Sequence, residues 1–557
     1  MVLLLVLLVV TEKLIPLSSS FSLISYPSTA KRHLQEKKTI YDGALCVSLN
    51  QEQEVRNEPS QLVRRKYLNG DDCIRGGEQD DNPVARAAPI AGKKQNMSIA
   101  ICGGGIAGMA FVLSLHDAGF HNIDIYESVS TISEVGVGIN IQPSAVRELI
   151  ELGLGEELSK TGIPTREIIY HHINGQEIFR EPRGKAAGYK WPQYSIHRGK
   201  LLGILHAAVV ERLGEERIHT GYKAIDCGQI TTTGEGVDNN VSWATFKVIK
   251  DNENKKKEGN AGAASEREKE QNKTTKTIEA DLIVGCDGVH SNIRKALTNE
   301  DAPRWTGIVM LRGLTKMKPF FTGCSMTIIG LIEREMVIYP ISKEVEDEGE
   351  SLVNWVALKQ VGKEKVKSLQ EKWSIEVENI DEAIKPFEHF QYDFIDVPNM
   401  IRSAEKVYQY PMIDRQPLDS WVYGNITLLG DAAHPMIPIG ANGATQAIID
   451  GRVLASELYH KKDISSALKA YDEKHREAVN NIVKANREES ETTFLEIIHK
   501  HCPDMNCKEY NFNDILTEED LKKISKTYKD VAGFNPETLN NRESYTVHVA
   551  EAIIEEM

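Results

Sequence analysis

The chain carries three glycines, Gly103, Gly105 and Gly108, in the spacing G-x-G-x-x-G. In such a turn the first glycine permits a tight bend, the second lets the backbone approach a pyrophosphate, and the third lets a helix pack closely on a strand. The apolar residues 98–102 before them predict a buried strand, and residues 109–118 after them have helical apolar spacing. The pattern favours the binding of a dinucleotide, with its phosphates on the helix N-terminus.

A second strand, predicted over residues 123–127, ends on the acid Glu127. An acid about 20 residues after such a turn can hydrogen-bond the ribose hydroxyls of an adenosine. Ile106 and Ala107 are expected under the phosphates, at the start of the helix. These features complete one βαβ unit, but they do not distinguish FAD from NAD, and a glycine-rich turn without a ligand is the alternative.

Two later apolar runs also end in small and acidic residues. One ends in Asp287 and Gly288, and the other ends in Gly430 and Asp431. Each of them alone is compatible with a purely structural turn at the end of a strand. Together with the glycine turn and the Ser-Ile-His-Arg-Gly run that contains Arg198, they match the three-part signature of flavoprotein aromatic hydroxylases.

From about residue 98 to residue 487 the chain resembles the class A flavoprotein aromatic monooxygenases, which are hydroxylases with an FAD-binding domain. Within that family it is most similar to the 5-methylphenazine-1-carboxylate monooxygenases and to salicylate-hydroxylase-like enzymes. The segments that carry the resemblance occur in the same order along the chain, and they are 136–143, 181–184, 192–199, 409–415 and 438–444.

The resemblance implies an α/β fold of the para-hydroxybenzoate hydroxylase type. In that fold a Rossmann-like FAD-binding domain contains an inserted mixed β-sheet substrate domain and is followed by C-terminal helices. By resemblance, Glu127 holds the adenosine ribose and Arg198 lies along the FAD chain. Asp287 and Gly288 serve both the pyrophosphate and the fold, and Asp431 holds the ribityl chain.

The resemblance also assigns a role to the start of the last expected helix. Backbone N–H groups there would face the pyrimidine end of the flavin and stabilise negative charge on the reduced ring. Pro438 is expected on the substrate side of the ring, and His434 is expected to be structural rather than a base. The residues that would present the N–H groups are Gly440, Ala441, Asn442 and Gly443.

The implied activity is hydroxylation of a small aromatic or conjugated substrate with dioxygen. FAD is the expected resident cofactor, and NADPH or NADH is expected as a transient reductant because the sequence holds no second G-x-G-x-x-G unit. Arg312 and Tyr339 lie on predicted strands of a second sheet, where they face either the substrate or the core. Leu311 and Ile437 stand where the phenazine-type enzymes have Trp and Tyr, which predicts less stacking surface for a flat tricycle.

Three other functions are compatible with a flavin-binding chain. A flavin halogenase is disfavoured because no W-x-W-x-I-P segment is present. A flavin-binding redox regulator would bind FAD without releasing a product, and an NAD(P)H oxidase would release only peroxide. Substrate-stimulated reduction of the flavin separates the monooxygenase from both.

Composition narrows the range of partners. The formal charge of −15 arises from 81 acidic and 66 basic residues, so no global attraction to nucleic acid or anionic lipid is expected. The eight cysteines are expected to be mostly reduced, although Cys502 and Cys507 are close enough to suggest a disulfide or a metal site. No metal is predicted. The expected partners are a small aromatic substrate and dioxygen, in a monomer or homodimer without a stable membrane span.

The chain outside the FAD-dependent unit is expected to contribute little to the fold. Residues 1–30 begin with a short apolar run, and they resemble a two-part plastid targeting segment, with an ordinary secretory signal or a cytoplasmic protein as alternatives. Residues 31–96 lack periodicity and predict a disordered spacer. Residues 501–557 are polar and are expected to form a C-terminal tail.

The expected unit itself spans residues 97–500. Its FAD-binding parts are placed at about 97–165, 193–300 and 408–475, and its substrate sheet is placed at about 166–192 and 302–407. Residues 251–276 are almost all polar or small, which predicts a mobile loop between two paired strands.

Overall fold

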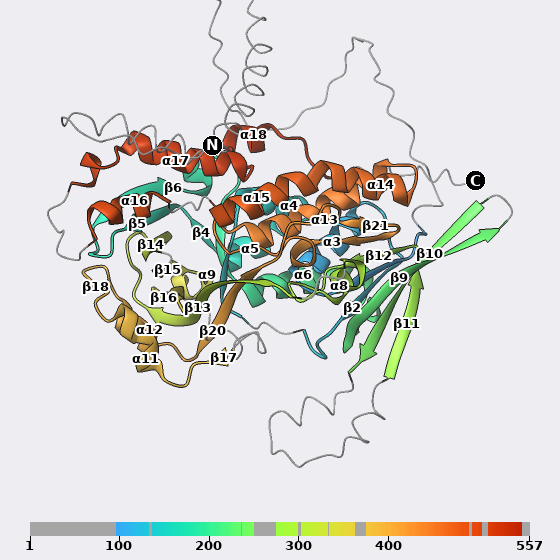
Figure 1. The fold of residues 1–557 in the computed structure, drawn as a ribbon, viewed down its shortest axis with the longest axis horizontal. Coiled ribbons are helices and arrows are strands. Elements are labelled where there is room, and N and C mark those ends of the chain that lie inside the picture. Colours follow the sequence, from blue (N-terminus) through green and yellow to red (C-terminus); the bar gives the residue numbers. More distant parts are fainter. Residues whose placement is uncertain are drawn as a thin grey trace, which may run out of the picture. The chain divides into compact units, whose positions relative to one another are not determined.

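The computed structural model describes residues 96–132, 136–234, 237–249, 274–298, 302–331, 333–361, 375–488, 493–503 and 511–547. In this part of the chain a mostly parallel six-stranded sheet and a larger eight-stranded sheet lie on opposite sides of the molecule (Figure 1). The fold is therefore the mixed α/β architecture that the resemblance implies. None of its described helices is long and apolar enough to cross a membrane.

The six-stranded sheet has the order β21-β22-β12-β1-β2-β8. All neighbours are parallel except β21 and β22. Every residue of β1 and β12 is buried, as expected for short apolar strands covered on both faces. The strands are β1 (Ile99–Cys102), β2 (Ile123–Glu127), β8 (Ile218–Thr220), β12 (Leu282–Gly285), β21 (Val422–Tyr423) and β22 (Ile426–Leu428).

Helices α3 (Ile106–Asp117), α6 (Arg198–Leu213) and α13 (Asn442–His460) pack beside this sheet. The approach of α13 to α3 requires a small residue, because a Cβ on Gly451 would lie 2.9 Å from the backbone of Phe111. A three-stranded sheet of β3 (Gly138–Ile141), β7 (Gln193–His197) and β4 (Ile163–Thr165) precedes α6, and α4 (Pro143–Glu151) contacts α13.

The eight-stranded sheet combines strands from distant parts of the chain, in the order β17-β20-β13-β16-β15-β14-β5-β6. The strand β20, which was expected in an FAD-binding part, belongs to this sheet. One face of the eight-stranded sheet packs on α11 (Ile380–Ile384) and α12 (Val397–Arg402). The strands are β5 (Glu167–His171), β6 (Glu177–Pro182), β13 (Arg304–Met317), β14 (Ser325–Leu331), β15 (Arg334–Pro340), β16 (Ser351–Gln360), β17 (Ile375–Glu376) and β20 (Val407–Asp414).

A hairpin-like sheet of β9 (Tyr222–Gly234), β10 (Val237–Val248) and β11 (Thr274–Ala280) projects from the molecule (Figure 1). Strands β10 and β11 pair, as expected for the segments on either side of the predicted loop, but residues 277–284, expected as one strand, are split at Asp281 between β11 and β12. The predicted loop 251–276 lies outside the described residues except for its last three positions, which belong to β11.

The C-terminal segment is not the separate tail that its polarity suggested. Helix α16 (Thr493–His501) closes the unit expected over residues 97–500, and α17 (Glu518–Val531) and α18 (Pro536–Asn541), which lie within residues 501–557, are also part of the folded body. Phe512, Leu516 and Leu521 are buried in one cluster with Ile168 and Tyr170 of β5. The segment looks polar because each helix buries only one narrow stripe. Cys502 takes part in a disulfide bond, whereas Cys102, Cys227, Cys286 and Cys324 are free.

Candidate active site

A cavity of about 440 Å³ runs from the glycine turn to the inner face of the eight-stranded sheet. It opens where the parallel strands β1, β12 and β22 end. Residues Gly105, Gly288 and Asp431, which follow these three strands, all line it. Ligands of open α/β sheets bind at the carboxyl ends of the strands, so three motifs far apart in sequence meet at one edge.

The three glycines of the turn have the distinct roles that the spacing predicts. Gly103 has a φ of +118°, and a Cβ there would lie 2.3 Å from the carbonyl oxygen of Cys286. A Cβ on Gly108 would lie 2.0 Å from the carbonyl oxygen of Gly103, so only glycine allows α3 to pack here. A Cβ on Gly105 would meet no atom within 4 Å. Gly105 thus opens onto free space at the N-terminus of α3, and the turn fits a pyrophosphate.

Glu127 and Asp287 do not line the cavity itself. Glu127 Oε2 accepts a hydrogen bond from the N–H of Gly104 at 2.7 Å, which places the carboxylate beside the glycine turn. Asp287 Oδ2 accepts from the N–H groups of Asn292 at 2.8 Å and Ile293 at 3.2 Å. Asp287 therefore caps α8 (Asn292–Thr298), while Gly288, with a φ of +77° and no atom near its missing Cβ, faces the cavity.

The cavity wall at the start of α13 consists mainly of backbone. Gly440, Ala441, Asn442 and Gly443 all line it, together with Pro438, whose side chain is exposed. Ala441 has a φ of +56°, which is unusual for a residue with a side chain. The helix that begins here was expected to be the last one, but further helices follow it.

Arg198 and Asp431 are the charged groups at this end of the cavity. Arg198 is the first residue of α6 and its side chain is exposed to the cavity, where the Asp431 carboxylate is exposed as well. Enclosure by the protein raises the pKa of Asp431, and the charges of His434 and Arg198 oppose that rise. Glycines, exposed backbone and one carboxylate are a suitable donor set for a phosphate-linked, hydroxyl-bearing cofactor.

The other end of the cavity is one face of the eight-stranded sheet. Side chains alternate between the faces of a strand, so the cavity is lined by every second residue along parts of β13, β14, β15 and β16 and by one residue of β5. Most of these residues are apolar, and they are Ile168, Met310, Met326, Ile328, Val337, Val356 and Leu358. Three polar side chains interrupt this apolar surface: Arg312, Glu335 and Tyr339.

Arg312 and Tyr339 converge on one backbone oxygen. Arg312 Nη2 donates to the carbonyl of Gly138 at 2.8 Å, and Tyr339 Oη donates to the same oxygen at 3.0 Å. Both residues thus hold β3, another wall of the cavity, and Arg312 Nε has no hydrogen-bond partner among the described residues. Burial raises the pKa of Tyr339, and the Arg312 charge opposes that rise.

Sequence reasoning did not single out Arg183, Gln193 and Glu335 as site residues. All three are at least nine-tenths buried and line the cavity. Arg183 Nη2 pairs with Glu181 at 2.9 Å and donates to Tyr170 Oη at 3.2 Å. The sequence contained features that could have identified them. Arg183 and Gln193 fall in segments that carry the family resemblance. Glu335 lies four residues before Tyr339 on one strand, and residues at this spacing share a face of the sheet.

Leu311 and Ile437 were expected to shape the substrate pocket, but neither lines the cavity. Leu311 lies between Met310 and Arg312 and therefore points to the opposite face of β13, where it packs with Trp355 and Ile384. Ile437 is buried behind Met310 and Met412. These two positions therefore do not change the stacking surface of the cavity, contrary to the expectation from the sequence.

His434 is structural, as predicted. It is 1% exposed, and its Nε2 lies 2.6 Å from Asp450 Oδ2, which also accepts from the N–H of Gly430 at 2.8 Å. His475 Nε2 lies 2.8 Å from the other oxygen of Asp450. The two histidines hold the pKa of Asp450 well below its usual range, and Asp450 in turn raises the pKa of His434. This network supports the turn that carries Asp431.

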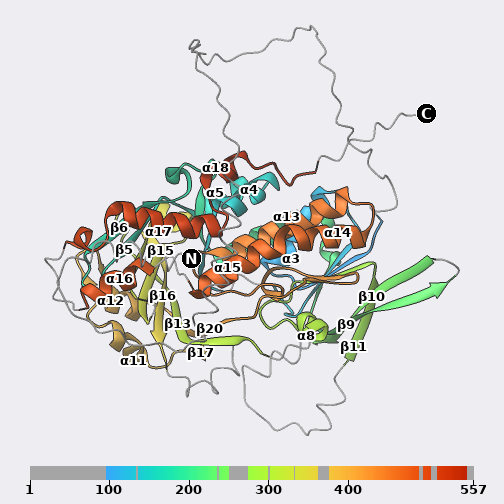
Figure 2. The same ribbon diagram turned by 45° about the horizontal axis from the view of Figure 1, so that its top comes forward.

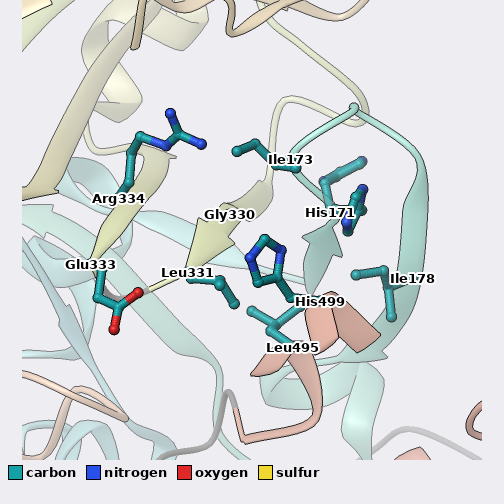
Figure 3. Close-up of a pocket in the computed structure, with 10 residues that line it drawn as sticks. His171, Ile173, Ile178, Gly330, Leu331, Glu333, Arg334, Leu495 and His499 are labelled. Atoms are coloured by element: carbon teal, nitrogen blue, oxygen red, sulfur yellow. The ribbon is translucent and has the colours of Figure 1, made fainter. Parts of the chain in front are cut away.

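A second pocket, of about 90 Å³, shares no lining residue with the main cavity. Figure 3 shows His499 and Leu495 of α16 reaching into it beside Gly330 and Leu331, with Glu333 and Arg334 farther along the same sheet edge. Burial lowers the pKa of His499 and that of the adjoining His171, the latter to about 4. No group of three potential metal ligands exists among the described residues, here or elsewhere.

The fold and the main cavity combine a glycine turn at the edge of a parallel sheet with the mostly apolar face of a second sheet. Residues 96–486 match the family model described as FAD binding domain. The chain is 37% identical over 394 residues to the phenazine 1,6-dicarboxylic acid hydroxylase of Lysobacter antibioticus, a match that covers 70% of this chain and 89% of that one. The chain belongs to the class A flavoprotein aromatic monooxygenases, which use FAD.

Two other similarities agree with this assignment. The 3-hydroxybenzoate 6-hydroxylase 1 of Aquipseudomonas alcaligenes is 27% identical over 387 residues, covering 67% of this chain and 84% of that one. The solved salicylate hydroxylase substrate complex superposes with a TM-score of 0.56 at 18% identity, covering 83% of this chain and 100% of that one. At this identity the second similarity concerns the fold alone.

Proposed function

We propose that the protein hydroxylates a flat aromatic carboxylate, with NADPH or NADH as the reductant of its FAD and dioxygen as the source of the oxygen atom. The overall reaction consumes substrate, dioxygen, NAD(P)H and one proton, and it yields hydroxylated substrate, water and NAD(P)⁺. The relatives named above act on a phenazine dicarboxylic acid and on a hydroxybenzoate, which supports this substrate class for the present chain.

The observation that carries the proposal is the placement of two guanidinium groups in a mostly apolar part of the cavity. Arg183 and Arg312 both line the sheet end of the cavity, among Met, Ile, Val and Leu side chains. A guanidinium binds a carboxylate with paired hydrogen bonds, and apolar walls bury the faces of an aromatic ring. Glu335 on the same surface would accept a hydrogen bond from a hydroxyl or ring N–H of the substrate.

FAD, when bound, supplies the redox chemistry, and the protein supplies orientation and charge placement. The glycine turn and the N-terminus of α3 would hold the pyrophosphate, Glu127 the adenosine ribose, and Asp431 the ribityl chain. Backbone N–H groups at Gly440 to Gly443 would lie at the pyrimidine end, and Pro438 would bound the substrate side. Arg312 and Arg183 would orient the carboxylate, and the apolar sheet face would exclude water.

The test is NAD(P)H oxidation by the purified full chain with FAD, run against benzoates, phenazine carboxylates and matched aromatics without a carboxylate. Substrate-stimulated consumption with little peroxide, and a product heavier by one oxygen atom, is expected only for carboxylates. Stimulation by neutral aromatics alone would contradict the substrate class. Peroxide without product would favour an oxidase, and bound FAD without any turnover would favour a redox regulator.

We also propose that residues 1–30 direct the protein to a plastid, on the strength of their apolar run and the hydroxylated, basic stretch that follows. Fusion of residues 1–96 to a fluorescent protein in an alga with secondary plastids tests this. Secretion of the fusion, or a diffuse cytoplasmic signal, would contradict it.

A further inference from the structure

Helix α17 lies in the C-terminal segment, beyond residue 486, where the match to the family model ends. In both views it runs over the edge of the eight-stranded sheet toward α15 (Glu477–Glu488) (Figures 1 and 2). Two neighbouring residues near its C-terminal end bear on different walls of the main cavity: Tyr528 contacts one wall directly, and Lys529 reaches another through Glu181.

Tyr528 contacts the loop that precedes α13, on the side away from the cavity. It is 7% exposed, it does not line the cavity, and its hydroxyl accepts a hydrogen bond from Asn442 Nδ2 at 2.8 Å. The hydroxyl lies 2.9 Å from Asn486 Oδ1 and 3.3 Å from the carbonyl oxygen of Ile439, either of which can accept its proton. A Cβ on Gly440 would lie 2.1 Å from this hydroxyl, so the loop and the ring are in direct contact.

Side chains hold three carbonyl groups of this loop. Asn486 Nδ2 donates to the carbonyls of Ile437 at 3.1 Å and Ile439 at 3.4 Å, and Gln142 Nε2 donates to that of Gly440 at 3.0 Å. In a trans peptide the C=O and the following N–H point in opposite directions. Holding the Ile439 carbonyl on the Tyr528 side therefore directs the Gly440 N–H toward the cavity.

Lys529 connects the same helix to the substrate end. Its Nζ pairs with Glu181 at 2.5 Å, and Ser525 Oγ donates to the same carboxylate. Glu181 in turn pairs with Arg183, which lines the cavity. The charges of Arg183 and Lys529 lower the pKa of Glu181 against the effect of its burial. One turn of α17 thus supports both the flavin loop and the guanidinium assigned to the substrate.

We propose that α17 is a built-in part of the active site, in which Tyr528 positions the flavin-binding loop and Lys529, through Glu181, positions Arg183. The role of Arg183 rests on the proposed function, whereas that of Tyr528 needs only FAD binding. The C-terminal segment therefore determines how tightly FAD is held, how well its reduced form is stabilised, and how the substrate carboxylate is oriented.

The test for the flavin end is Tyr528→Phe in the full chain. Loss of the hydroxyl removes bonds to Asn442 and to the loop, so the FAD dissociation constant is expected to rise about tenfold. The midpoint potential should become more negative, because fewer aligned N–H groups stabilise the reduced ring. In the FAD-free protein, amide hydrogen exchange should accelerate at residues 439–443.

Tyr392→Phe is the matched control, because that hydroxyl also donates to a backbone carbonyl, Ile173, at 2.8 Å, but Tyr392 packs in a hydrophobic cluster that contains no residue of the loop and does not line the main cavity. It should leave all three quantities unchanged. If Tyr528→Phe lowers the melting temperature while affinity, potential and loop exchange stay at wild-type values, Tyr528 is only structural and the proposal is overturned.

The test for the substrate end is Lys529→Met. The KM for an aromatic carboxylate should rise at least threefold while kcat and the flavin potential change little, because Arg183 remains charged but is less well oriented. Thr527→Val on the exposed side of the same helix is the control. An equal rise in both variants, or none in Lys529→Met, would overturn this arm. Neither result affects the FAD measurements, so failure of the substrate assignment is distinguishable from failure of the positioning role.

Discussion

The two ends of the main cavity are built in different ways. The cofactor end consists of glycines and strand-end turns whose roles follow from short motifs, and a Cβ added to Gly103 or Gly108 would meet backbone atoms at 2.3 Å or less. The substrate end is one face of a sheet whose strands come from residues 167–182 and 304–414. The turn tolerates no side chain at Gly103 or Gly108, whereas a sheet face can change its side chains without changing the fold. This difference explains how one family can keep FAD and vary its substrates.

The largest effect is expected from Gly103→Ala. The new methyl group would lie against the Cys286 carbonyl and would require a left-handed backbone conformation, so bound FAD should be lost and the fold destabilised by about 3 kcal/mol. Flavin absorbance after purification and thermal melting measure this.

Gly105→Ala is the matched variant, since its Cβ meets no protein atom and its backbone is ordinary. It should leave the melting temperature of the FAD-free protein unchanged and weaken only FAD binding. Equal losses of stability in the two variants would contradict the separate roles assigned to the two glycines.

Asp450→Asn should have the next largest effect, because it breaks the buried pair with His434 and should cost about 3–5 kcal/mol. Because the pKa of Asp450 is depressed in the folded state, the carboxylate stabilises the fold at pH values above about 4, the pKa of an aspartate in the unfolded chain. This stabilisation is lost as the pH falls toward the pKa of Asp450 in the folded state. Because the pKa of His434 is raised in the folded state, its protonation stabilises the fold fully at pH values below about 6.5, the pKa of a histidine in the unfolded chain. This stabilisation is lost as the pH rises through the pKa of His434 in the folded state.

Melting temperatures of wild type and Asp450→Asn across acidic and neutral pH measure both dependences. The wild type should be most stable between the two transitions, and the variant should show a flatter profile. A variant that retains the full pH dependence would show that this network is not its source.

Arg312→Met tests the substrate end. It removes a charge from the apolar face, so the KM for an aromatic carboxylate should rise about 10- to 100-fold, the equivalent of about 1.5–3 kcal/mol, while FAD stays bound. The variant Leu311→Ala, at the neighbouring position, should instead lower the stability of the fold by about 2–5 kcal/mol and leave the substrate preference unchanged, because Leu311 packs on the opposite face of the sheet. A shift of substrate preference in Leu311→Ala would contradict the assignment of the two faces.

Tyr339→Phe should have the smallest effect. It removes one of two donors to the Gly138 carbonyl and should cost about 1 kcal/mol of stability, with a small rise in KM. A large fall in kcat would instead indicate that Tyr339 contacts the substrate directly, which steady-state kinetics would reveal.

The sequence alone was sufficient for the geometry of the glycine turn. Gly103, Gly105 and Gly108 lie within six residues, and the strand and helix that they join are local, so spacing determines their geometry. Spacing also located the turns after two further strands, although Asp287 caps α8 and only its neighbour Gly288 lines the cavity. Alternation of residue types predicted a second sheet over the region of β13 to β16, where it occurs.

Only the tertiary structure decided which side chains meet at the substrate end. The pairing of strands from distant parts of the chain places Arg312 inward and Leu311 outward, a choice that depends on sheet register and not on residue type. It also places Arg183, Glu335 and the turn of α17 that carries Tyr528 around one cavity, although they lie in three separate segments. Local spacing fixes a backbone turn, but long-range burial alone selects the neighbours of a side chain.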